Sequence, residues 1–190
     1  MSFEQRKKDI LKKKDKSFKG SVDREIQPLV SLINSKRNFY TTSSCSGRIM
    51  LIDDSGEKKE NAFIMVSHKP LKPKIDAKDI EETLIEHYYN KVYFKMEPCI
   101  LHVACKSFED AIKLVEIARN AGWKKSGVIS KNNIAELIST ESLSLPIGLN
   151  GFLIVDQKYM AELIKEANEK LKRTFDKIKR LSKELKNKID

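Results

Sequence analysis

Residues 40–48 read YTTSSCSGR, and the chain is organised around this stretch. Six consecutive residues in it carry small hydroxyl or thiol side chains, which add little to a hydrophobic core. The residues on both flanks are typical of strands, and the apolar run at 49–52 is β-rich. Gly47 permits a positive φ or a close backbone approach to a ligand, and Arg48 offers a fork of donors to a carboxylate or phosphate. We expect a binding loop; the alternative is a half-solvated strand ending in a Ser-Gly turn.

Composition restricts the class of protein. The chain has 190 residues, 40% hydrophobic and 34% charged, which suits a single domain. No apolar run approaches the ~20 residues of a membrane span, and the N-terminal residues lack the apolar centre of a secretory signal, so we expect a cytoplasmic protein with no membrane partner. The three cysteines have no metal-binding spacing with the three histidines, so no metal is expected.

Positive charge is concentrated near the N-terminus. The formal net charge is +10, and eight Lys and Arg residues fall within residues 1–20, which we expect to form a basic arm ahead of a catalytic domain at 21–190. A polyanion is the natural partner, and nucleic acid fits better than a membrane surface because the arm lacks a bulky apolar face. The alternative is a Lys-rich and Glu-rich surface of the kind found in proteins from hot environments, which binds nothing.

Hydrophobic periodicity predicts an α+β fold with a largely antiparallel sheet, flanking helices and a long C-terminal helix. The second half of that helix is long enough to project or to pair with another protein. Ser46-Gly47 and Ser126-Gly127 interrupt similar strand regions, which hints at an internal duplication. The predicted helices are 1–16, 22–35, 76–89, 107–121 and 157–188; the predicted strands are 49–52 with 62–67 as one hairpin, 92–96 with 100–104 as a second, then 123–129, 134–139 and 152–155.

Several separate motifs resemble the tRNA wybutosine-synthesising protein 3 family, in the right order and over nearly the whole chain. They are Thr-Ser-Ser-Cys-Ser-Gly-Arg-Ile at 42–49, Asp-x-Ser-x-Lys-Gly-x-x-Asp at 15–23, Ser-His at 67–68, Glu-Pro-x-Ile-x-His-Val around 97–103 and a Ser-Gly pair at 126–127. Two positions depart from the family pattern: Phe63 stands where a Trp is expected, and the strand near Leu137 lacks an Arg.

The resemblance implies an S-adenosylmethionine-dependent methyltransferase that acts on phenylalanine tRNA. The methyl group goes to the N-4 nitrogen of the tricyclic wyosine precursor beside the anticodon. The chain has no strand followed by a Gly-x-Gly-x-x-Gly turn, so S-adenosylmethionine must bind in an unusual way.

The resemblance also selects site residues. The candidate general bases are His68, Glu97 and His102, which the sequence does not rank; alternation places His102 on the opposite face from Leu101 and Val103. Cys45 is interpreted as a small packing or polar-contact residue. The expected cofactor-binding residues are Ser43, Ser44, Ser46, Gly47, Arg48, Ser126 and Gly127. The expected substrate-binding residues are Asp15, Ser17, Lys19, Asp23 and Arg48.

Two other functions compete with the methyltransferase. The first is a non-enzymatic RNA-binding protein, whose basic arm and C-terminal helix grip phosphates while the Ser-rich stretch cradles one more. The second is a hydrolase that uses Cys45 and His102, for which the sequence offers no oxyanion donor and no orienting partner.

Overall fold

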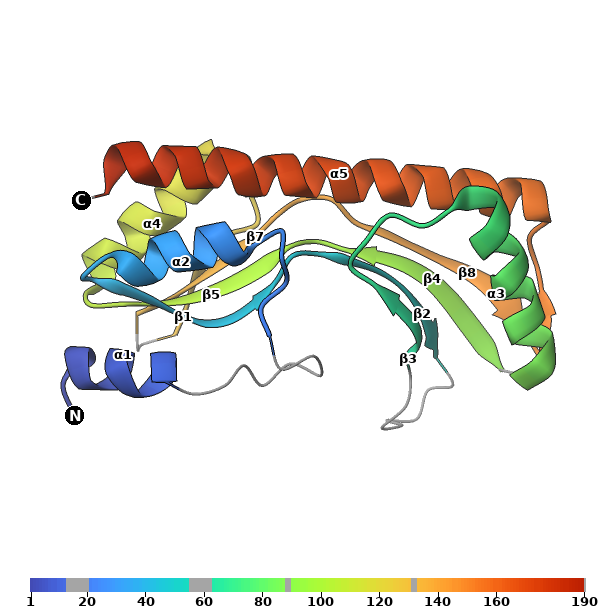
Figure 1. The fold of residues 1–190 in the computed structure, drawn as a ribbon, viewed down its shortest axis with the longest axis horizontal. Coiled ribbons are helices and arrows are strands. Elements are labelled where there is room, and N and C mark those ends of the chain that lie inside the picture. Colours follow the sequence, from blue (N-terminus) through green and yellow to red (C-terminus); the bar gives the residue numbers. More distant parts are fainter. Residues whose placement is uncertain (13–20, 55–62, 88–89, 131–132, 190) are drawn as a thin grey trace. The chain divides into compact units, whose positions relative to one another are not determined.

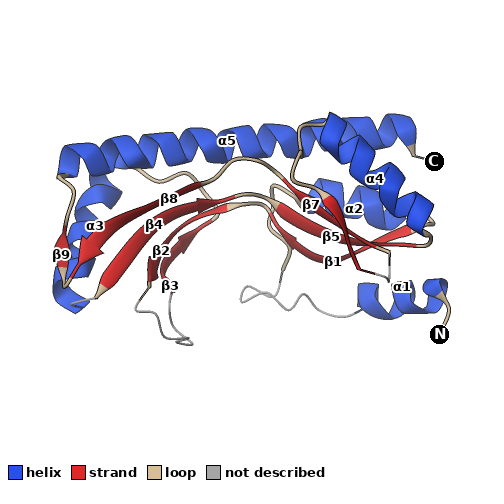
Figure 2. Cartoon of the chain, turned by 180° about the vertical axis from the view of Figure 1, so that it is seen from behind, coloured by secondary structure: helices blue, strands red, loops and turns tan. Residues whose placement is uncertain are grey.

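The computed structural model describes residues 1–12, 21–54, 63–87, 90–130 and 133–189. Within these residues the fold is α+β, and every paired strand is antiparallel, as the sequence predicts (Figures 1 and 2). The strands form two sheets, whereas one was expected. The elements are α1 (Phe3–Lys12), α2 (Gln27–Ser35), β1 (Phe39–Cys45), β2 (Arg48–Asp53), β3 (Phe63–Ser67), α3 (Pro73–His87), β4 (Lys91–Glu97), β5 (Ile100–Cys105), α4 (Phe108–Asn120), β6 (Gly127–Ser130), β7 (Ile134–Ile138), β8 (Leu143–Leu149), β9 (Phe152–Leu153) and α5 (Gln157–Lys188).

The two sheets belong to two compact units, and each unit is built from segments that are separated in the sequence. Unit 1 comprises Met1–Ser46, Pro98–Thr140 and Thr174–Asp190, and unit 2 comprises Gly47–Glu97 and Glu141–Arg173. Sheet 1, in unit 1, has the strand order β1-β5-β7-β6, and sheet 2, in unit 2, has the order β3-β2-β4-β8-β9. The predicted hairpin of β4 and β5 is therefore wrong. Pro98 separates these strands and cannot donate to a ladder, and the chain changes sheets at this point.

Helices α2 and α4 contact sheet 1 and share the core of unit 1 with the second half of α5. That core includes strand residues such as Leu101 and Val103, and the fully buried Trp123, whose indole N–H donates to the carbonyl of Lys177 at 3.2 Å. The predicted projection of the second half of α5 is wrong, because its apolar face completes the core of unit 1 with Ile178, Leu181, Leu185 and Ile189.

Helix α1 lies on the other side of sheet 1 from α2 and α4 (Figures 1 and 2). The Phe3 and Tyr40 rings pack with their centroids 5.1 Å apart, Glu4 pairs with Lys106 at 2.9 Å, and the Lys7 ammonium donates to the carbonyl of Lys36. No residue of α1 is buried. The basic arm thus begins with a helix, docked through a few side chains.

Local signals explain most element boundaries. The Ser107 hydroxyl caps α4 by accepting the Asp110 N–H at 3.1 Å, and Gly122 follows the helix with a φ of 96°. Helix α2 begins at Gln27 and not at 22, because Pro28 occupies its first turn, where the missing N–H costs nothing.

Unit 2 builds its core from sheet 2, α3 and the first half of α5. Asn168 on α5 makes two 2.8 Å hydrogen bonds with the backbone of Leu71 and so fixes the entry to α3. Strand β8 was missed by the sequence analysis because Pro146 argues against a strand; its partner strand accommodates it with a register shift between Val92 and Tyr93. A Cβ on Gly148 would lie 2.9 Å from a methyl of Leu84, so a larger residue does not fit there.

Candidate active site

The stretch at 40–48 is a strand followed by a sharp break. Tyr40 to Cys45 lie in β1, so the stretch is not a loop, and the alternative conformation, a half-solvated strand ending in a Ser-Gly turn, is confirmed. The β1–β5 register shifts between Thr41 and Ser43, which is a bulge at Thr42. Gly47 has a φ of 92°, the conformation its freedom was expected to supply.

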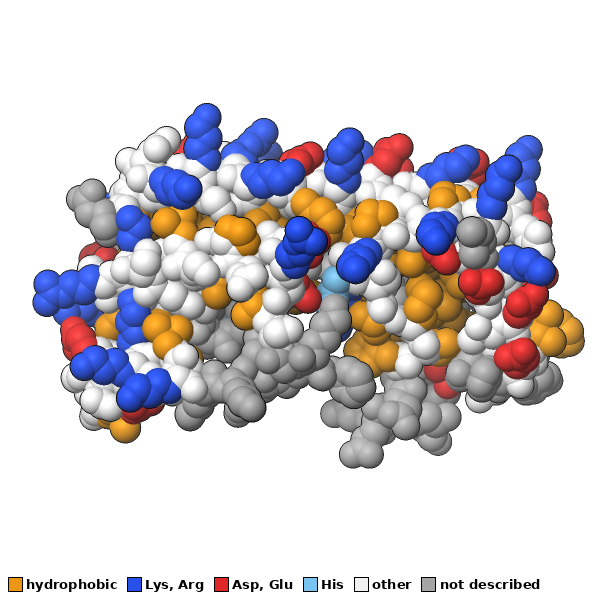
Figure 3. All heavy atoms as spheres, viewed as in Figure 1, with side chains coloured by type: hydrophobic (Ala, Val, Ile, Leu, Met, Phe, Trp, Pro, Cys, Tyr) orange, Lys and Arg blue, Asp and Glu red, His pale blue; other side chains and the backbone are white. Residues whose placement is uncertain are grey.

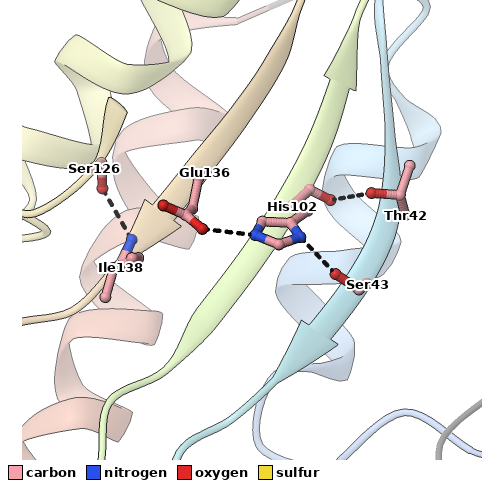
Figure 4. A network of polar contacts seen from close by, with 6 residues as sticks. All are labelled: Thr42, Ser43, His102, Ser126, Glu136 and Ile138. Carbon is pink, nitrogen blue, oxygen red and sulfur yellow. Dashed lines mark hydrogen bonds and ion pairs between the residues drawn. The ribbon is translucent and has the colours of Figure 1, made fainter. Parts of the chain in front are cut away.

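Three polar side chains line up across the outer face of sheet 1 (Figure 4). Ser43, His102 and Glu136 are direct cross-strand partners on β1, β5 and β7. His102 Nδ1 lies 2.9 Å from Ser43 Oγ, and His102 Nε2 lies 2.9 Å from Glu136 Oε1. We call these three residues the histidine row. As alternation predicts, His102 faces away from the buried Leu101 and Val103 and is part-exposed.

The hydrogen bonds of the histidine row indicate which ring nitrogen of His102 carries the hydrogen. An ionised Glu136 carboxylate only accepts, so the neutral imidazole carries its hydrogen on Nε2 and leaves a lone pair on Nδ1. The hydroxyl of Ser43 then donates to Nδ1, and its own oxygen lone pairs are available to a ligand. Ser43 is exposed, so the row presents a polarised hydroxyl to the surface of unit 1.

Gly127 extends the row by one strand, because it pairs with Glu136 across β6 and β7. Nothing lies within 4 Å of the position that a Cβ would take there, so the space beside Glu136 is open. The neighbouring Ser126 is buried, and its hydroxyl donates to the Trp123 carbonyl at 2.7 Å and accepts the Ile138 N–H at 3.1 Å (Figure 4). The Ser126 hydroxyl is therefore occupied by hydrogen bonds within unit 1.

The other predicted residues of unit 1 lie close to the end of β1. Asp23 accepts the backbone N–H of Ser46 at 2.9 Å, and Ser46 is fully buried. Ser44 and Cys45 are half-buried, and Cys45 forms no disulfide. The remaining predicted substrate-binding residues, Asp15, Ser17 and Lys19, lie outside the described residues.

In unit 2, Arg48 and Glu97 are cross-strand partners on β2 and β4. Arg48 Nε and Nη2 contact Glu97 Oε2 at 2.9 and 2.8 Å, and the guanidinium lies 5.2 Å from the centre of the Phe63 ring. The carboxylate of Glu97 is thus already occupied by a cation, which makes it a poorer proton acceptor than His102. His68 follows the last residue of β3, where the Ser67 hydroxyl donates to the carbonyl of Lys69 at 2.7 Å.

The sequence analysis missed Glu136. It stands between Ala135 and Leu137, which are both fully buried, so alternation alone places it on the outer face of β7. What the sequence lacks is the strand pairing that sets Glu136 opposite His102, since the two residues are 34 positions apart.

Two other thiols are unsuited to catalysis. Burial raises the pKa of the Cys99 thiol well above its usual value and that of the Cys105 thiol to about 12. Both side chains are buried and are protonated at neutral pH.

Solved structures share this fold. A protein from Pyrococcus horikoshii OT3 aligns with a TM-score of 0.86 and 33% identity, over 99% of this chain and 95% of that one. A second, from Aeropyrum pernix, aligns with a TM-score of 0.74 and 28% identity, over 87% of this chain and 98% of that one. Across the described residues, no helix has the length and apolar character that crossing a membrane requires. The fold and the histidine row are consistent with an enzyme.

The chain belongs to the family described as Methyltransferase TYW3, whose sequence pattern matches residues 5–187, and it is therefore a methyltransferase. A relative from Thermococcus sibiricus is 35% identical over 95% of this chain and 92% of its own length. It is named tRNA(Phe) 7-((3-amino-3-carboxypropyl)-4-demethylwyosine(37)-N(4))-methyltransferase. A relative from Danio rerio, named tRNA wybutosine-synthesizing protein 3 homolog, is 38% identical over 95% of this chain and 73% of its own length.

Proposed function

We propose that this enzyme methylates the N-4 nitrogen of the tricyclic demethylwyosine base in tRNA(Phe), with S-adenosylmethionine as the methyl donor. The names of the relatives support the reaction, and the histidine row is the observation that supports the chemistry. None of the three cysteines forms a disulfide, which is consistent with a reducing, cytosolic setting for the reaction.

Methylation of N-4 forms an N–CH₃ bond while the S–CH₃ bond of the donor breaks, so that the donor sulfur would leave as a neutral thioether, and the nitrogen loses its proton. The Ser43 oxygen accepts that proton while the Ser43 hydroxyl gives its own proton to His102 Nδ1. The resulting imidazolium is stabilised by Glu136 at Nε2, 2.9 Å away. His102 is the preferred base among the three candidates, because Glu97 is bound by Arg48 and the ring of His102 is oriented at both nitrogens.

The residues of unit 1 fit a bound methyl donor in part. S-adenosylmethionine supplies an electrophilic methyl group on a sulfonium. The open space at Gly127 beside Glu136, together with the Ser43 hydroxyl, offers polar contacts and a nearby negative charge, whereas Ser44 pairs with the buried Leu101 on the opposite face of sheet 1. No Gly-rich crossover exists among the described residues, whose strand pairs are all antiparallel, so the donor is held by strand side chains. Among the other predicted cofactor-binding residues, Ser46 and Ser126 are buried in unit 1, and Arg48 is paired with Glu97 in unit 2.

Basic side chains supply the affinity for RNA. Lys and Arg gather along α5 and on α1 (Figure 3), and the chain has 37 of them against 27 acidic residues. Phosphates neutralised by such side chains release counterions, which makes RNA binding salt-dependent. We infer that these helices contact the tRNA backbone and leave recognition of the base to another surface.

A single-turnover assay tests the proposal. The enzyme is mixed in excess with tRNA(Phe) carrying 7-(3-amino-3-carboxypropyl)-4-demethylwyosine and with S-adenosylmethionine, and the base is analysed by mass spectrometry. We expect one added methyl group on N-4 and none on tRNA with an unmodified guanosine. Salt-sensitive tRNA binding with neither methyl transfer nor S-adenosylmethionine binding would contradict the proposal and favour the alternative of a non-enzymatic RNA-binding protein.

A further inference from the structure

A cavity of about 330 Å³ lies between α1 and the outer face of sheet 1, inside unit 1. This is within the range of small-molecule sites. Two of its walls are aromatic, Phe3 from α1 and Tyr40 from β1, and two of its rim residues are cations, Arg6 and Lys106. We call this cavity the Tyr40 pocket; Ala104, Cys105, Asn133 and Ile134 complete its lining.

The Tyr40 pocket adjoins the histidine row on the same face of the sheet. Tyr40 pairs with Ala104, and Ser43 pairs with His102. Ala104 and His102 are two positions apart on β5, which corresponds to about 7 Å along a strand. A flat ring system stacked on Tyr40 therefore extends naturally toward Ser43.

Helix α1 covers Tyr40 with contacts that a ligand can replace. The Phe3 ring packs on Tyr40 at a tilt of 50°, and the two side chains of the Glu4–Lys106 pair are 50% and 40% exposed, so the pair stabilises the contact only weakly. The helix buries none of its own residues. An aromatic ring and a carboxylate, both from α1, thus occupy adjacent positions over the outer face of the sheet.

A ring with a carboxylate beside it is also what the relatives' substrate offers. Their names give a tricyclic base that bears a 3-amino-3-carboxypropyl chain, so the molecule is aromatic at one end and carries a carboxylate beside an ammonium group at the other. RNA-binding proteins commonly recognise an unstacked base by stacking it on an aromatic side chain. Lysine and arginine are the usual partners of a carboxylate.

We propose that the Tyr40 pocket receives the tricyclic base, stacked on Tyr40 in place of Phe3, with the carboxylate of its amino-carboxypropyl chain on Lys106 and Arg6 in place of Glu4. This inference rests on the proposed function and assigns to it a specificity site. Tyr40 holds the ring, Lys106 reads the chain, and the histidine row accepts the proton.

The test measures equilibrium binding, without methyl donor, of three tRNAs that carry the chain-bearing base, 4-demethylwyosine without the chain, or unmodified guanosine. Tyr40→Leu keeps an apolar, though smaller, side chain but removes the aromatic face, so affinity for both modified tRNAs falls about tenfold or more while affinity for unmodified tRNA is kept. Lys106→Gln removes only the preference for the chain-bearing base. Glu4→Gln removes the competing carboxylate and tightens binding of the chain-bearing tRNA about two- to fivefold.

Two controls separate the outcomes. Phe152→Leu removes an exposed aromatic ring of unit 2 and leaves all three affinities unchanged, and melting temperatures confirm that each variant folds. In calorimetry with S-adenosylmethionine alone, the Tyr40→Leu variant is expected to bind the methyl donor as tightly as the wild type does. Weaker binding of S-adenosylmethionine by this variant would assign the pocket to the methyl donor and overturn the inference. Equal discrimination by wild type and Tyr40→Leu would overturn it too. A wild type that binds all three tRNAs equally would likewise overturn the inference, whereas a wild type that does not methylate the chain-bearing tRNA refutes the proposed function.

Discussion

Replacing Glu136 by Ala removes the group that holds the proton of His102 on Nε2. The lost contact is a 2.9 Å charge-assisted hydrogen bond, of a kind that contributes about 1.5–3 kcal/mol. The two side chains are 31% and 28% exposed, so solvent reduces this to about 1–2 kcal/mol. Without Glu136 the imidazole also populates the tautomer with hydrogen on Nδ1, which cannot accept the proton of Ser43. We expect the single-turnover rate of methyl transfer to fall about 5- to 30-fold.

The assay separates positioning from stability. Because Glu136 acts through His102, the rate falls while the KM for tRNA stays within about twofold of the wild-type value. Glu136→Gln keeps an acceptor for Nε2–H and regains part of the rate. His102→Ala removes the base itself and lowers the rate about 10²- to 10⁴-fold. Glu116→Ala, at an exposed glutamate of α4, is the control. A normal rate for Glu136→Ala, or a loss matched by a lower melting temperature and a raised KM, would refute the reasoning.

Arg48→Lys keeps the charge but not the fork of donors, so the single-turnover rate of methyl transfer is expected to fall by about one to two orders of magnitude with the fold intact. A near-normal rate would show that Arg48 serves only its pair with Glu97. Lys8→Gln with Lys12→Gln on α1 should weaken tRNA binding and flatten its salt dependence, measured by binding titrations in increasing salt, and an unchanged slope would place α1 outside the phosphate contacts. Burial raises the pKa of Cys105 to about 12 from an ordinary 9.0. Between pH 9 and pH 12 the thiol is therefore protonated in the folded protein and ionised in the unfolded chain, so unfolding releases a proton. The free energy of unfolding falls as pH rises through this range, by about 1.4 kcal/mol per pH unit. Denaturant unfolding of Cys105→Ala at two pH values within this window should show a shallower fall, and an equal slope would mean that the thiol does not titrate there.

Much of the fold follows from local patterns in the chain. The long helix α5, the helix predicted at 107–121 and the alternation at Leu101 and Val103 each depend on neighbouring residues, and each prediction is confirmed. Predictions failed where the decisive contact was distant in sequence. The division into two sheets and the burial of the second half of α5 are set by pairings across more than forty residues, which periodicity does not encode.

The candidate site shows the same limit. His102 was named from the resemblance, and its outward direction follows from alternation. Its partners Ser43 and Glu136 come together only through the β1–β5 and β5–β7 registers, one of which contains a bulge that shifts Ser43 by one place. A bulge at Thr42 leaves no mark in the composition of a Ser- and Thr-rich strand.

The interleaved chain path has a consequence for synthesis on the ribosome. The chain passes between the two units after residues 46, 97, 140 and 173, and Ile178, Leu181 and Leu185, which complete the core of unit 1, are made after all the strands of sheet 1. The apolar face of sheet 1 therefore stays incomplete until the second half of α5 has been made. Such distant pairings also slow folding. A nascent chain stalled after Arg173 is expected to depend on chaperones, and a premature stop there removes unit 1 as a folded body.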